Sequence, residues 1–145
     1  MKQYLTLLTA FTLSVFGFHP ASAGEEHAEH MLKGYLDVAK ALYEDDLATA
    51  RKEAQALAKH DSDSVLAGSA QKVANAQDIV AARSAFKTLS AEAIKLAEGH
   101  GEGEYTVMHC PMVKGGGGDW LSADAEVNNP YFGARMPHCG GPAKK

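Results

Sequence analysis

Residues 78–99, DIVAARSAFKTLSAEAIKLAEG, carry the clearest helical pattern in the chain. Apolar side chains recur there every three or four positions, as one buried face of an α-helix requires. They are Ile79, Ala82, Phe86, Leu89, Ala93, Leu96 and Ala97. Asp78 stands where a side chain can accept a hydrogen bond from the first helical turn, and Gly99 stands where a glycine commonly follows a helix. The stretch therefore predicts a helix over residues 79–98.

Three more apolar stripes precede this helix, over residues 32–43, 47–58 and 65–76. Acidic and serine-rich turns separate them, and Asp46 is placed to cap the second helix. No proline occurs between residues 25 and 99. Four helices joined by short connections favour antiparallel neighbours. We therefore predict an all-α fold, an antiparallel up-down four-helix bundle over residues 24–99.

Residues 100–145 differ in composition, because they hold four of the five prolines, many glycines and both cysteines. Such a segment cannot be regular helix throughout. We expect an irregular Pro/Gly-rich segment that packs on the bundle as part of one domain, 24–145, with a short strand or two around residues 105–110. Trp120, Tyr131 and Phe132 are the aromatic residues expected to pack against the helices.

The first 23 residues have the pattern of an export signal. Lys2 precedes an apolar run over residues 4–18, and Ala21-Ser22-Ala23 is a small-x-small cleavage site. An uncleaved N-terminal anchor is the alternative. We expect a periplasmic or otherwise exported protein without a membrane span after cleavage. Cleavage changes the formal net charge from −4 to −5, because the signal holds one lysine and no acid. A chain this acidic does not favour nucleic acid as a partner.

Two short clusters in the C-terminal segment combine thiol, thioether and imidazole groups. The first contains Met108, His109, Cys110 and Met112, and the second contains Met136, His138 and Cys139. Sulfur ligands prefer soft ions, which favours copper(I) over zinc, whereas calcium and magnesium need oxygen ligands that are scarce here. The ligands we expect are Cys110, Met112, Met136 and Cys139, followed by His109 and His138.

A longer pattern joins these clusters to the aromatic residues between them. It runs Tyr105…His109-Cys110-Pro111-Met112…Trp120-Leu121…Asn129-Pro130-Tyr131-Phe132-Gly133…Met136…Cys139-Gly140. The pattern resembles the DUF3347 family of exported bacterial domains, some of which are fused to adaptor subunits of heavy-metal efflux pumps of the CusB type. The resemblance implies a helical domain with a Cys-Pro-Met and Met-x-x-Cys-Gly tail. It also implies a role in copper handling, with efflux-pump components or another copper carrier as partners.

Other interpretations of the same residues remain open. Cys110 and Cys139 can form a structural disulfide, which would make the tail the docking surface of a non-metal interaction module. A thiol redox protein is less favoured, because no Cys-x-x-Cys motif occurs. The sequence shows no catalytic arrangement of acids or of a nucleophile with its base, so we do not expect an enzyme.

Histidines form a third group, near the predicted bundle end. His27, His30 and Met31 lie within one helical turn, at spacings i, i+3 and i+4. In an up-down bundle this turn shares an end with His60 and His100, which close the second and fourth helices. These residues form either a second, weaker metal site or a solvated N-terminus.

Overall fold

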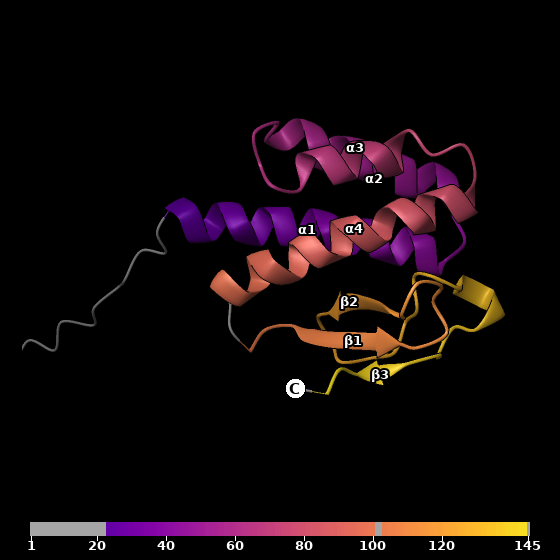
Figure 1. The fold of residues 1–145 in the computed structure, drawn as a ribbon. Coiled ribbons are helices and arrows are strands. Elements are labelled where there is room, and N and C mark those ends of the chain that lie inside the picture. Colours follow the sequence, from indigo (N-terminus) through magenta and orange to yellow (C-terminus); the bar gives the residue numbers. More distant parts are fainter. Residues whose placement is uncertain (1–22, 101–102, 145) are drawn as a thin grey trace, which may run out of the picture.

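The computed structural model describes residues 23–100 and 103–144, so most of the predicted signal peptide lies outside the described residues. Four helices come first, followed by short strands and one turn of 3-10 helix (Figure 1). The helices are α1 (Ala23–Tyr43), α2 (Leu47–His60), α3 (Ala67–Ala74) and α4 (Ile79–Gly99). The later elements are β1 (Thr106–Cys110), β2 (Gly118–Ser122), the 3-10 helix η1 (Gly133–Arg135) and β3 (Gly141–Pro142).

The prediction of an all-α fold is wrong, because the tail forms a three-stranded antiparallel sheet in the order β2-β1-β3. β1 pairs with β2 from Thr106 opposite Ser122 to Cys110 opposite Gly118, and residues 111–117 form the connection between them. β3 adds two residues on the other side of β1. The four helices are present, and Figure 1 shows α2 and α3 on one side of α1 and α4 with the sheet on the other.

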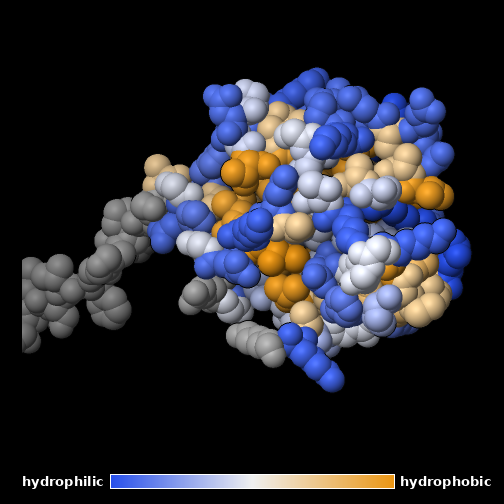
Figure 2. Space-filling view, in the orientation of Figure 1, coloured by the Kyte–Doolittle hydropathy of each residue, from blue (hydrophilic) through white to orange (hydrophobic). Residues whose placement is uncertain are grey.

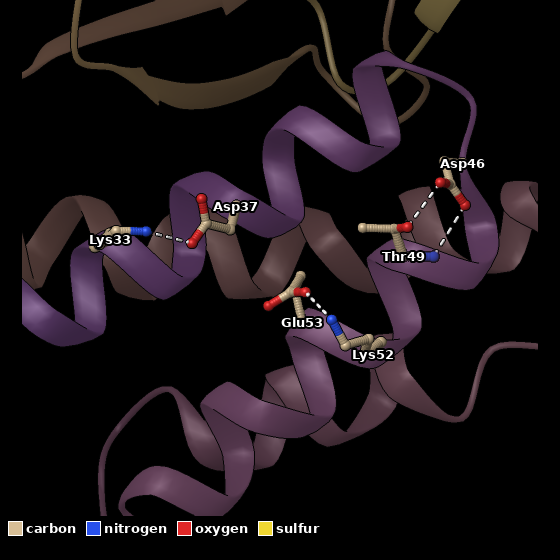
Figure 3. A network of polar contacts seen from close by, with 6 residues as sticks. All are labelled: Lys33, Asp37, Asp46, Thr49, Lys52 and Glu53. Carbon is tan, nitrogen blue, oxygen red and sulfur yellow. Dashed lines mark hydrogen bonds and ion pairs between the residues drawn. The ribbon is translucent and has the colours of Figure 1, made fainter.

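Helix ends follow the predicted caps at two positions. The Asp46 carboxylate accepts hydrogen bonds from the Thr49 backbone N–H at 2.9 Å and from the Thr49 hydroxyl at 2.7 Å (Figure 3). These bonds lower the pKa of Asp46. The Asp78 carboxylate accepts the N–H of Ala81 at 2.8 Å. Gly99, predicted to follow α4, is instead its last helical residue, and His100 continues with an extended backbone.

The core lies between the helices and the inner face of the sheet. Small alanine side chains line much of the helix interfaces, and the bulk comes from a few large residues. Tyr35 on α1 stacks on Phe86 of α4, with ring centroids 5.3 Å apart, and Tyr131 meets Phe86 edge-on at 5.6 Å. Trp120 is 2% exposed and contacts Tyr131 edge-on. The tail therefore contributes aromatic area that the alanine-rich helices lack.

A buried chain of hydrogen bonds fixes β2 on the helices. The Tyr35 hydroxyl accepts the backbone N–H of Leu121 at 3.2 Å and bonds to the Ser90 hydroxyl at 2.7 Å. Ser90 in turn donates to the carbonyl of Asp119 at 2.7 Å, and the Tyr131 hydroxyl donates to the same carbonyl at 2.6 Å. Burial of these hydroxyls raises the pKa of Tyr35 and of Tyr131. The network fixes how close β2 lies to α1 and α4, and it thereby fixes the position of Asp119.

An ion pair fixes the tail at a second point. The Arg83 guanidinium lies 2.6 Å from an Asp45 carboxylate oxygen and also donates to the carbonyls of Leu42 and Pro130. The other Asp45 oxygen accepts the N–H of Ala134 at 2.9 Å. The loop between α1 and α2 is thereby joined to Pro130, just before η1, and to Ala134 within η1. This attachment lies a few residues before the second sulfur cluster.

The outer surface is mostly polar. In Figure 2, hydrophilic residues cover much of the outer helical layer, and apolar residues are visible along the middle of the face. Exposed ion pairs lie on the helix surfaces, such as Lys33 with Asp37 at 2.7 Å (Figure 3). Pairs of this kind add little to the stability of the fold. In the described part of the chain, no helix has the length and apolar character that a membrane span requires.

Candidate metal centre

Cys110 ends β1 and faces the bundle. Side chains alternate along a strand, so Cys110 shares the inner face with Met108, and both are fully buried. Pairing with Gly118 of β2 fixes the backbone at this position. A proline disfavours a helical backbone at the residue before it, and Cys110, which precedes Pro111, has the extended conformation of β1.

Cys139 is the last residue of a turn in the second half of the tail. Its N–H donates to the carbonyl of Met136 at 3.2 Å, which closes a turn over residues 136–139. The fully buried Asn129 side chain donates to the carbonyl of Cys139 at 2.6 Å, and the Asn129 N–H donates to the carbonyl of Pro137 at 2.9 Å. Gly140 follows with φ 128°, and a Cβ there would lie 2.7 Å from the His109 carbonyl oxygen. These contacts bring the Cys139 backbone close to β1.

The two thiols meet at this point. The Sγ atoms of Cys110 and Cys139 are 2.8 Å apart, across a sequence separation of 29 residues, and both cysteines are free. The hydrogen bond with the Cys110 thiol raises the pKa of Cys139. At neutral pH this favours the protonated thiol, so a metal ion that binds here must displace a proton.

The distance between the two sulfur atoms is longer than in a disulfide and shorter than in a pair of thiolates bound to one metal ion. A disulfide requires about 2.05 Å. Two thiolates bound tetrahedrally to one ion at about 2.3 Å lie roughly 3.8 Å apart. The pair must therefore open by about 1 Å to bind an ion, or close by about 0.75 Å to form a disulfide. Cys139 is only half-buried, so its side chain is the one with room to move.

His109 lies beside this pair on the outer side of the sheet. Its Nδ1 donates to an Asp119 carboxylate oxygen at 2.6 Å, across the β1–β2 ladder that pairs these two residues. Metal-binding histidines commonly donate one ring nitrogen to a carboxylate, which leaves the other nitrogen as a ligand. His109, Asp119 and Cys139 all line one hollow of about 690 Å³. The bond to Asp119 thus leaves Nε2 as the ring nitrogen that could bind a metal, and this nitrogen lies beside Gly117.

The remaining predicted ligands are not part of the contact between the two cysteines. Met112 lies in the turn after β1 with 61% of its surface exposed, and Met136 is half-buried at the start of the turn that leads to Cys139. The exposed His138 donates from Nδ1 to the carbonyl of Val127 at 2.9 Å. The structure therefore brings together the two cysteines, sets His109 at their margin, and leaves Met112 facing solvent.

Two residues with a clear role in this arrangement were not among the predicted site residues. Asp119 orients His109, and Asn129 holds the backbone of Cys139. Asp119 is separated from His109 by ten residues, and only the strand register makes them neighbours. Asn129 belongs to the longer pattern quoted from the sequence, but its side-chain bond to a residue ten positions later has no local signal in the sequence.

The histidines near the bundle end are placed together, as the up-down topology predicts. His27, His30 and His60 have neighbouring rings, and His27 and His100 line one shallow hollow. Met31, by contrast, is 1% exposed and belongs to the core. Over residues 23–100 and 103–144, no three histidine, cysteine or acidic side chains are grouped so that they can hold a metal ion as they stand.

Comparison with known proteins gives one match. The model of a family described as "Protein of unknown function (DUF3347)" matches residues 31–104. This range covers most of α1, all of α2, α3 and α4, and stops before β1. The tail residues on which the resemblance was based therefore lie beyond the matched range. Neither the curated proteins nor the solved structures that were compared with the chain gave a match.

Proposed function

The chain belongs to the DUF3347 family, and we propose that it binds one soft metal ion, copper(I) in preference to zinc, through Cys110 and Cys139. The observation that carries this proposal is the 2.8 Å approach of the two sulfur atoms. One thiol comes from a strand end and the other from a turn that Asn129 holds. A rigid backbone on both sides reduces the entropy that is lost when the ligands converge on an ion.

The donor set supports copper(I) over other ions. Thiolates bind copper(I), zinc and iron–sulfur clusters, whereas thioethers favour copper(I). Met112 and Met136 lie within three residues of the two cysteines along the chain. The nearest carboxylate described above, Asp119, is engaged with His109. His109 is the third ligand in this proposal, and Asp119 positions it.

The exposure of Met112 supports a carrier role rather than tight storage. Its thioether stands in a solvent-facing turn directly after Cys110-Pro111. A partner with sulfur ligands can approach from this side and share the ion before Cys110 and Cys139 release it. We therefore propose a non-enzymatic protein that buffers or delivers copper in the periplasm or another exported location, with an efflux-pump component or copper carrier as its partner.

A second candidate rests on the same sulfur distance. If the thiols are oxidised in the cell, a Cys110–Cys139 disulfide locks the tail, and the sheet becomes a docking surface without a metal. On the chain-entropy model, closing a loop of this length stabilises the fold by roughly 3–4 kcal/mol. A thiol count on protein freshly isolated from its own compartment separates the two: two free thiols favour the carrier, and none favours the disulfide module.

The test of the carrier proposal is a copper(I) competition titration of the reduced chain against a chromophoric chelator, without oxygen. We expect about one copper(I) per chain. Cys110→Ser and Cys139→Ser should each weaken binding by more than the roughly 10–100-fold that loss of an outer-shell partner costs. Met112→Leu should weaken it less. Met108→Leu is the matched control, because Met108 is fully buried in the core and should leave affinity unchanged. Parent-like affinity in both cysteine variants contradicts the proposal.

A further inference from the structure

Four of the seven histidines lie at one end of the helical bundle, away from the thiol pair. His27 and His30 belong to the first turns of α1, His60 is the last residue of α2, and His100 directly follows α4. The loop after Cys110 is held by Lys87, whose ammonium group donates to the Gly115 carbonyl at 2.9 Å. Lys87 and Gly99 are 12 residues apart, which is about 18 Å along a helix. The histidines therefore form a separate feature.

His60 lies between the other two rings of this cluster. Its ring centroid is 4.0 Å from that of His30 and 5.5 Å from that of His27. Two imidazoles bound tetrahedrally to one ion have centroids roughly 5 Å apart, given a metal–nitrogen bond of about 2.0–2.1 Å. The spacing of His27 and His60 is close to this value, whereas the rings of His30 and His60 must separate by about 1 Å to share an ion.

All three histidines are exposed, so their rings are free of core packing. As they stand, the rings lie face to face, and their nitrogen atoms do not converge on one point. Rotation about side-chain bonds is enough to turn them, because their backbone positions are fixed by α1 and α2. No rearrangement of the fold is required.

The charges around His27 favour a cation. Its Nε2 lies 3.0 Å from an Asp61 carboxylate oxygen, and Asp61 and Asp63 line the same hollow as His27 and His100. The C-terminal end of α2, where His60 sits, adds the negative end of a helix dipole. Lys33 and Lys59 border the other side, next to His30. The His27 side is therefore the more favourable one for the ion.

From this arrangement we propose a second metal site, in which His27, His30 and His60 bind one divalent ion of intermediate softness, with Asp61 as an added ligand or as the group that orients His27. Imidazole suits zinc, copper(II) and nickel, and affinity in such sites increases from nickel to copper(II). The site differs in ligand type from the thiol pair, so the two sites select different ions and different copper oxidation states. It does not depend on the proposed function of the cysteines.

The experiment is a zinc titration of the full chain that carries Cys110→Ser and Cys139→Ser, so that no thiol contributes. Isothermal titration calorimetry should give about one zinc per chain, with tighter binding of copper(II) and none of magnesium. In this background, His60→Ala should reduce zinc affinity by at least about tenfold, which is 1.4 kcal/mol. His27→Ala should reduce it in the same direction.

Gln55→Ala is the matched control, because Gln55 is an exposed residue of α2 outside the cluster, and it should bind zinc like the background chain. Circular dichroism checks that each exposed histidine variant keeps its helices. If the background chain binds no zinc, or if His60→Ala binds as tightly as the background, the second site does not exist.

Discussion

The hydroxyl of Tyr35 accepts the backbone N–H of Leu121, although 86 residues separate the two in the chain. Because the tyrosine is fully buried in α1 and the leucine belongs to β2, this bond joins the helical layer to the sheet. The same hydroxyl bonds to Ser90, which in turn binds the carbonyl of Asp119. Helix packing and the position of the candidate metal centre are coupled through these groups.

Tyr35→Phe should therefore destabilise the protein by about 1–3 kcal/mol, the cost of leaving buried polar groups without their partner. Urea unfolding followed by circular dichroism measures the loss. Tyr43→Phe is the matched control, because within the described residues the Tyr43 hydroxyl has no hydrogen bond, and the free energy of unfolding should barely change. Equal losses in both variants would show that the buried network does not hold the sheet.

Gly133→Ala should destabilise the fold by about 1–3 kcal/mol. Gly133 has φ 53°, and a Cβ there would collide with the Arg83 guanidinium and the Asp45 carboxylate. Gly68→Ala is the control, since Gly68 lies in α3 with open space around it. Alanine favours helix over glycine, so Gly68→Ala should be neutral or stabilising. A harmless Gly133→Ala in the same unfolding experiment would contradict the proposed fit of the tail against α4.

Asp45 should give the fold a measurable pH dependence. The N–H of Ala134 and the Arg83 guanidinium lower the pKa of this carboxyl in the folded state. Its contribution is therefore complete above the unfolded pKa of about 3.9 and is lost as pH falls through the lower folded pKa. The parent should be more stable than Asp45→Asn at pH 6, and the difference should shrink below about pH 4. A difference that stays constant down to pH 2 would count against this ion pair.

How far the sequence predicts this molecule depends on the range of the interactions. Helical periodicity and the caps at Asp46 and Asp78 are local, and they are confirmed. The three-stranded sheet was not predicted for two reasons. Buried and exposed residues do not alternate along β2, and β3 is only two residues long. β1 is the exception, because all of it lies within residues 105–110, where a short strand or two were expected.

The candidate site shows the same limit. Clustered sulfur ligands indicate that the two ends of the tail should meet, and the cysteines do lie together. The sequence could not show that Met112 faces solvent, because that depends on the turn after β1. Nor could it pair His109 with Asp119, since a shift of one residue in the strand register would separate them.

Asp119→Asn should lower copper(I) affinity by roughly 10–100-fold while leaving the stoichiometry at one, as expected for an outer-shell partner of a histidine ligand. His109→Ala should have at least the same effect, and the two changes combined should not add. Asp37→Asn, at an exposed ion pair on α1, is the control and should bind copper like the parent. Full affinity in Asp119→Asn would remove His109 from the ligand set.

We propose that Cys110 and Cys139 bind the same ion. Copper K-edge X-ray absorption on the reduced, copper(I)-loaded chain tests it most directly, because it reports the elements bound to the metal. We expect two thiolate sulfurs and one imidazole nitrogen around a single copper(I), with one sulfur lost in Cys139→Ser. A spectrum that is the same in the parent and in Cys139→Ser would contradict it.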